Sequence, residues 1–74
     1  MGSWDKTGQY HPEFGERMRH RPSGDVCRFR HEGYVQAKRV LVGVVENGNT
    51  TLIGPIADWE MLDLPPDPYD RAGR

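Results

Sequence analysis

Apolar residues are concentrated in one stretch of the chain, from Gln36 to Ile56. Its two arms, Val40–Val45 and Leu52–Ile56, are rich in β-branched side chains, and Asn47-Gly48 lies between them. Asn-Gly tolerates the positive φ angles of a type I′ turn, so the pattern predicts two antiparallel strands joined by a tight hairpin. The first arm is apolar on both faces, which is typical of closed or sandwiched sheets. Gly43 in its middle indicates a bulge or a sharp bend.

The segment before this hairpin alternates between polar and apolar residues. Between Asp25 and His31, Cys27 and Phe29 are expected to face one way, with the intervening arginines on the opposite, solvated side. This pattern predicts a strand with one wet face, and Glu32-Gly33 is expected to end it.

The segments on either side are less regular. Pro12 to His20 has Phe14 and Met18 four residues apart and predicts one or two helical turns. Ala57–Leu64 fits a helical turn or a short strand equally well, and we expect a strand because the preceding chain is β. Pro55 lacks a ladder donor, so the end of the second arm is expected to lie at an edge of the sheet or to leave the sheet.

These elements together predict a mainly β protein. We expect a small, strongly bent antiparallel sheet or an SH3-like barrel of four or five short strands, with flexible N- and C-terminal tails. One domain would occupy residues 12–64, between a flexible arm at 1–11 and a proline-rich tail at 65–74. Trp4 is the one large aromatic near the start of the arm, and the sequence leaves open whether it docks onto the body.

Composition narrows the class of function. The chain has 74 residues, 35% of them hydrophobic, and a mean hydropathy of −0.81. So short a chain buries only about 60% of its unfolded surface, which leaves little room for a substrate pocket, so we expect no enzyme. The single cysteine, Cys27, predicts a reducing, cytoplasmic location. The chain has no long apolar run, so we expect no membrane-spanning segment. Its first residues contain no apolar stretch, so we expect no signal peptide.

The net charge of −1 hides a marked polarity. Residues 17–39 contain seven basic and two acidic side chains, whereas residues 46–70 contain six acids and no base. This asymmetry is compatible with an anionic partner for one half and a basic partner for the other. Equally, the two halves can neutralise each other across the fold.

The basic half supplies the candidate binding residues. Arginines and lysines that share a face bind phosphates, and an aromatic ring among them can stack on a base. The sequence pI of about 6.3 is low for a dedicated nucleic-acid domain, for which pI exceeds about 9. The candidates for binding a partner or a nucleic acid are Arg19, Arg21, Arg28, Arg30, Tyr34, Lys38 and Arg39.

Two short motifs resemble known families. Cys27-Arg28-Phe29-Arg30-His31 resembles the last Cys-x3-His step of CCCH zinc fingers, a family that binds RNA; the resemblance covers five residues, and the other two cysteines have no counterpart here. On a strand, at about 3.3 Å per residue, its Cys and His lie ~13 Å apart. His11 and His20 can complete a zinc set only if the chain folds back. We therefore expect a buried structural Cys27, no metal and no cofactor.

The second motif lies in the proline-rich tail. Leu64-Pro65-Pro66-Asp67-Pro68-Tyr69 resembles a short proline-rich ligand, with one residue more than the Pro-Pro-x-Tyr that WW domains bind. The alternative is a polar tail whose prolines stop the sheet from continuing.

We therefore predict a non-enzymatic binding or adaptor module, or a small accessory subunit, that acts through its charge-polarised surface. The expected partner is another protein. The alternative is a nucleic-acid-binding protein that uses the strand face formed by Arg28, Arg30, Lys38 and Arg39. Because the edge strands of a small sheet can pair with other strands, a second copy of the chain is a further candidate partner.

Overall fold

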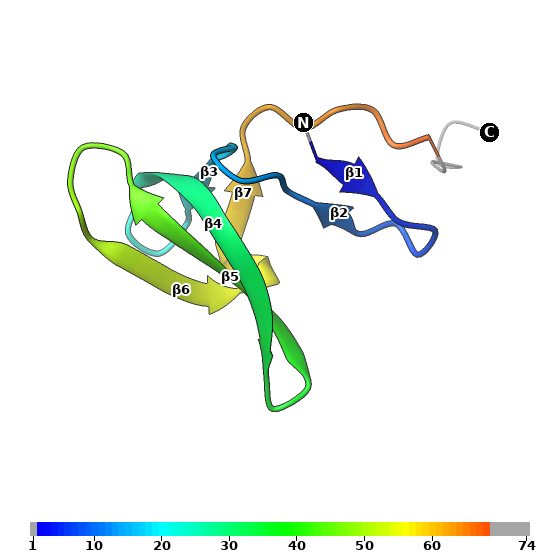
Figure 1. The fold of residues 1–74 in the computed structure, drawn as a ribbon, viewed down its shortest axis with the longest axis horizontal. Helices are drawn as coiled ribbons and strands as arrows, with labels where there is room; N and C mark the ends of the chain where they lie inside the picture. The colour runs from blue at the N-terminus through cyan, green and yellow to red at the C-terminus, as the bar shows by residue number, and fades with distance from the viewer. Residues whose placement is uncertain (1, 69–74) are drawn as a thin grey trace.

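The computed structural model describes residues 2–68, and in this range the chain is mainly β. Its elements are β1 (Ser3–Trp4), β2 (Tyr10–His11), β3 (Arg17–His20), β4 (Val26–Val35), β5 (Lys38–Val45), β6 (Thr51–Pro55), the 3₁₀ turn η1 (Ile56–Asp58) and β7 (Trp59–Met61). The strands β1 and β2 form a small hairpin, and the others form an antiparallel sheet in the order β6-β5-β4-β3-β7. Figure 1 shows the hairpin set to one side of this sheet.

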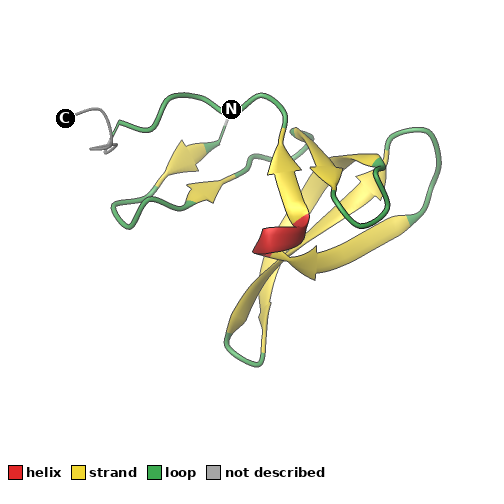
Figure 2. Cartoon of the chain, turned by 180° about the vertical axis from the view of Figure 1, so that it is seen from behind, coloured by secondary structure: helices red, strands yellow, loops and turns green. Residues whose placement is uncertain are grey.

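The mainly β prediction is confirmed, but the predicted barrel is not. The five-stranded sheet ends in β6 on one side and β7 on the other, and these two strands do not pair with each other. The sheet is therefore bent but open, and an SH3-like architecture is not confirmed. Figure 2 shows η1 as the short red turn that leads from β6 to β7.

The tight turn of the fold lies elsewhere than predicted. β4 and β5 meet at Gln36-Ala37, whose φ angles of 51° and 64° are the two positive values that a type I′ turn requires. The strands β5 and β6 do pair as predicted, but through a longer loop closed by a hydrogen bond from Val45 N to Thr50 O. Asn47-Gly48, in this loop, does not adopt positive φ, because a longer loop does not need the mirror-image turn.

The expected end of the preceding strand is also wrong. β4 runs through Glu32-Gly33 to Val35, because both of these residues pair with β5. A bulge is present, but on β4: the register shifts between Phe29 and His31, which leaves Arg30 as the extra residue beside Gly43.

Gly43 is required by the core rather than by a bend in its own strand. A Cβ at this position would lie 2.8 Å from Met18 Cε and 3.0 Å from Cys27 Cβ. Both neighbours are fully buried. The glycine therefore allows the methionine side chain to lie directly against the β5 backbone.

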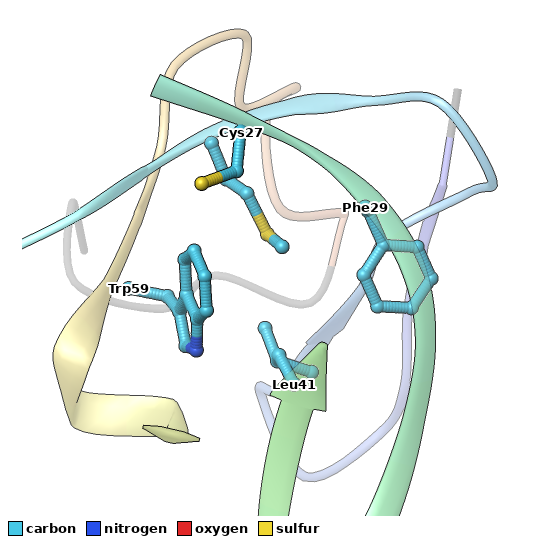
Figure 3. Close-up of a cluster of buried hydrophobic side chains, with 5 residues drawn as sticks. Cys27, Phe29, Leu41 and Trp59 are labelled. Carbon is cyan, nitrogen blue, oxygen red and sulfur yellow. The ribbon is translucent and has the colours of Figure 1, made fainter. Parts of the chain in front are cut away.

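The core lies on one face of the five-stranded sheet, which we call the inner face. It consists of Met18, Cys27, Phe29, Leu41 and Trp59, with Val45, Leu52 and Met61 packed against it. Figure 3 shows Cys27, Phe29, Leu41 and Trp59 converging on one space. The predicted alternation is confirmed, since Cys27 and Phe29 are buried and the arginines between and after them are exposed.

The predicted helix at residues 12–20 is wrong. Residues 17–20 form β3, which lies between β4 and β7 and places Met18 opposite Cys27 and Met61. Burial of this side chain at the centre of the sheet outweighs the weak i, i+4 signal from Phe14, which is exposed. At the other end, the preferred strand for the segment after Pro55 is confirmed as β7.

The first prediction concerns Gly43. Replacing Gly43 with Ala should destabilise the protein by about 1–3 kcal/mol, the usual cost of overpacking a filled core. Gly33→Ala is the matched control, because it lies in the adjacent strand with no atom within 4 Å of the added methyl group. Urea denaturation measures both. Equal stability of the two variants would contradict the packing at Gly43.

Candidate binding surfaces

The outer face of the five-stranded sheet, opposite the core, carries several of the predicted basic residues. In the strand register, Arg28 of β4 lies opposite Arg17 of β3 on one side and Val44 of β5 on the other. Further along the sheet, Val42 of β5 lies opposite His31 of β4 and Ile53 of β6. Cross-strand partners share a face. The outer face is therefore made by Arg17, Arg19, Arg28, Arg30, His31, Val42, Val44 and Ile53.

Most guanidinium groups of this face have acidic partners. Glu46 Oε2 lies 3.1 Å from Arg17 Nε and 3.0 Å from Arg28 Nε, and Arg28 also donates to the Gly15 carbonyl at 3.0 Å. Arg19 lies 3.4 Å from Glu60. These side chains are all partly exposed, so the pairs stabilise the fold by little. Their effect is to neutralise part of the positive potential.

Arg30 differs from the other arginines of the outer face. Its guanidinium carbon lies 5.2 Å from the centre of the Phe14 ring, in a cation–π contact. Phe14 is exposed, so this pair forms a flat, cationic platform at the surface. The sequence did not indicate a surface role for Phe14, because its spacing from Met18 is typical of a helix face.

Next to this platform the outer face is hollowed, with two valines among polar and charged side chains. A groove of about 390 Å³ is lined by Arg30, His31, Val42, Val44, Asn49 and Thr51. Ile53, which pairs with Val42 from the edge strand β6, is 61% exposed. β-branched side chains are therefore surrounded by arginine and histidine at the open edge of the sheet.

Arg39 is not on this surface. It lies on the inner face and is 9% exposed, with Nε 2.7 Å from Glu32 Oε2 and Nη2 donating to the Tyr10 carbonyl at 2.9 Å. Arg39 is thus a structural residue that joins β5 to the β1–β2 hairpin. Among the described residues, no buried side-chain nitrogen or oxygen lacks a hydrogen-bond partner.

His11 extends this junction. Its Nδ1 lies 3.0 Å from Glu32 and its Nε2 lies 2.7 Å from Asp5. Glu32 first, and then Asp5, raise the pKa of His11 above its ordinary value. Burial alone would raise the pKa of Glu32, but hydrogen bonds from Arg39 and His11 outweigh burial and lower it. A doubly protonated imidazolium satisfies both carboxylates at once.

The remaining predicted residues are scattered. Tyr34 and Lys38 are exposed near the Gln36-Ala37 turn, where the β4–β5 hairpin projects beyond the rest of the sheet (Figure 1). Arg21 follows β3 and lines a separate cleft on the side of the inner face. The structure thus places Arg19, Arg28 and Arg30 on one face and separates them from the other four predicted residues, Arg21, Tyr34, Lys38 and Arg39.

The cleft that includes Arg21 lies between the β1–β2 hairpin and the sheet. It has a volume of about 510 Å³, and the residues that line it include Trp4, Tyr10, Trp59, Met61 and Leu64. The Trp4 and Tyr10 rings are tilted at 59° with centroids 5.2 Å apart. The sequence singled out Trp4 but not Tyr10, because nothing in a polar arm indicates that a hairpin buries the tyrosine.

Cys27 is buried and has no disulfide partner. Burial, and to a smaller extent the charge of Asp25, raise the pKa of its thiol. A raised pKa suits a core residue and opposes the thiolate that a nucleophile or a zinc ligand needs. Within residues 2–68, no group of three or more histidine, cysteine, aspartate or glutamate side chains is arranged to hold a metal ion. No helix in this range has the length and apolar character to cross a membrane.

Comparison of the chain with protein-family models, with curated proteins and with solved structures finds no match. The surfaces described above are therefore the basis for a functional proposal.

The second prediction distinguishes a buried basic side chain with a structural role from an exposed basic side chain. Arg39→Ala should destabilise the protein by about 2–4 kcal/mol, slightly below the ~3–5 kcal/mol for breaking a fully buried pair, because Glu32 keeps 27% of its side-chain exposure. The neighbouring Lys38→Ala should change stability by less than about 0.5 kcal/mol. Urea denaturation compares the two, and an equally small effect for both would show that the Arg39 junction contributes nothing.

The third prediction concerns pH. Because the pKa of His11 is raised on folding, its charge contributes fully below its unfolded pKa of about 6.5, and this contribution is lost as pH rises through the folded pKa. The melting temperature of the wild type, relative to His11→Asn, should therefore fall as the pH rises above about 6.5. A wild type that gains stability over this range relative to His11→Asn would refute the assignment.

Proposed function

We propose that this chain is a non-enzymatic binding module that binds another protein through the outer face of its sheet. The observation that carries the proposal is a β-branched strip among arginine side chains, in which Ile53 is exposed, Val44 is partly buried and Val42 is buried at the floor of the groove. Protein interfaces combine an apolar centre with arginine, whereas lysine is depleted from them. The outer face has this composition, and its basic residues defined above are arginine and histidine.

The charge distribution favours a protein over a polyanion. Of the seven basic residues between positions 17 and 39, four are already paired with Glu32, Glu46 or Glu60. Nucleic-acid affinity depends mainly on the number of cations free to replace phosphate counterions. The partner expected here has an apolar surface with a few carboxylates, which Arg30 and His31 at the rim of the groove can bind.

The second candidate is a nucleic-acid-binding protein, and a specific observation favours it. Arg30 over Phe14 presents a cationic aromatic platform beside Arg28, and such platforms stack on unpaired bases. Arg39 does not contribute to this candidate, because it is buried. The cytoplasmic location and the possibility of a homo-oligomer stay predictions.

The fourth prediction tests the outer face. Ile53→Asp places a charge on the exposed residue of the β-branched strip, whereas Val35→Asp places the same charge on an exposed residue of the β4–β5 turn region. Tagged wild-type and variant chains are used to capture proteins from an extract of the native cell, with quantification by mass spectrometry. A specific partner should be retained by the wild type and Val35→Asp and reduced at least about tenfold by Ile53→Asp, a loss of ~1.4 kcal/mol.

The same proteins decide between the two candidates. Fluorescence polarisation with single-stranded and duplex oligonucleotides, between about 50 and 200 mM salt, measures the electrostatic term. Tight binding that weakens steeply with salt and is reduced by Arg28→Gln would establish the second candidate. Captured proteins that bind the wild type, Ile53→Asp and Val35→Asp equally would refute the first candidate, a module that binds a protein through the outer face.

A further inference from the structure

The segment after β7 lies beside the β1–β2 hairpin. In both ribbon views the chain leaves β7 and runs along the hairpin on the side of β1 (Figures 1 and 2). The indole Nε1–H of Trp4 donates a hydrogen bond to the carbonyl oxygen of Pro65, at 3.0 Å, across 61 positions of sequence. Trp4 is half-buried, and its ring is supported by Tyr10 behind it.

This contact has the chemistry of polyproline recognition. A proline has no N–H, so a Pro-Pro segment offers carbonyl acceptors without a competing donor and already favours the extended polyproline II conformation. Domains that bind such segments use aromatic-lined grooves, in which a Trp indole can supply its one donor. Trp4 beside Tyr10 presents both the ring surface and the donor.

The site extends beyond the residues that the chain's own segment covers. Trp4 and Tyr10 also line the cleft of about 510 Å³, together with Leu64, Trp59 and Met61. Leu64 is 50% exposed and Pro66 is exposed, so the segment of this chain lies over the edge of the cleft rather than filling it. A longer proline-rich ligand would bury more apolar surface there than residues 64–66 do.

We propose that Trp4 and Tyr10 form a receptor for a proline-rich segment of another protein, and that Leu64-Pro65-Pro66 occupies this receptor in cis. The tethered segment competes with an external ligand, so the apparent affinity for that ligand is reduced by the fraction of receptor that is occupied. The site lies on the hairpin, not on the outer face of the sheet. Its existence is therefore independent of the function proposed above.

The fifth prediction uses the two tryptophans of the ¹⁵N-labelled full-length chain. A capped peptide with the sequence of residues 64–68 is titrated while the indole N–H resonances are recorded. The Trp4 resonance should shift and saturate, and it should move more than that of Trp59, whose ring lines the same cleft but whose indole donates to Gly54 O at 3.2 Å. A peptide with the three prolines replaced by alanine should bind at least fivefold more weakly.

Two variants distinguish the contribution of the Trp4 binding site to peptide affinity from the competition by the tethered segment. In the full-length chain carrying Pro65→Ala and Pro66→Ala, the tethered segment loses its preorganisation, so the proline peptide should bind at least threefold more tightly. Trp4→Phe keeps a ring but removes the donor, and should reduce peptide affinity at least fivefold, as measured by calorimetry. The dispersion of its amide spectrum checks that this variant is folded.

Three results would overturn the proposal. The first is a Trp4 resonance that does not move at millimolar peptide in the chain carrying Pro65→Ala and Pro66→Ala. The second is equal affinity for the proline and alanine peptides. The third is a Trp4 resonance that depends on protein concentration but not on peptide, because the segment would then exchange between two copies of this chain.

Discussion

The ion pair between Arg39 and Glu32 is the interaction that links the two halves of this structure. It lies on the inner face of the sheet, beyond the apolar core, at the place where the β1–β2 hairpin meets β4 and β5. A buried guanidinium is costly unless its donors are satisfied, and here a carboxylate and the Tyr10 carbonyl accept them. The position of the hairpin is thus fixed by electrostatics at a site that the small apolar core does not reach.

This junction affects both binding surfaces. Arg39 is buried in this junction on the inner face, so the surface of the protein has one free cation fewer than the sequence suggests, and this weakens the case for a nucleic acid. By holding the hairpin, it positions Trp4 and Tyr10 along the cleft. The two surfaces lie on different parts of the molecule, so a partner on one does not exclude a partner on the other. Such an arrangement suits a small connecting module.

Glu46 and Glu60 reduce the positive charge of the outer face, whereas a dedicated phosphate-binding surface keeps its cations free. They come from the acidic half of the chain and lie against Arg17, Arg28 and Arg19 of the basic half. The polarity along the sequence is therefore cancelled in part, by two of the six acids of the acidic half. The β-branched strip that ends in the exposed Ile53, rather than charge, becomes the more distinctive feature of the outer face.

Local patterns in the sequence determined much of the sheet. Alternation placed Cys27 and Phe29 inside, β-branched residues paired β5 with β6, and Pro55 lies on an edge strand. These features follow from side-chain period and backbone chemistry, which act over a few residues. The turn at Gln36-Ala37 had no local signal, because neither residue favours positive φ; pairing along the long β4–β5 hairpin imposes it.

Only the tertiary structure decided which charged residues are available. Glu32 and Arg39 meet because that turn places them diagonally on one face, and His11 joins them from 21 positions away. The contact between Trp4 and Pro65 joins segments almost at opposite ends of the chain. Such contacts depend on the path of the whole backbone, whereas a sequence pattern reports only on neighbours within one strand or turn. That is why β4, β5 and β6 were predictable, whereas β1–β3 and the binding surfaces were not.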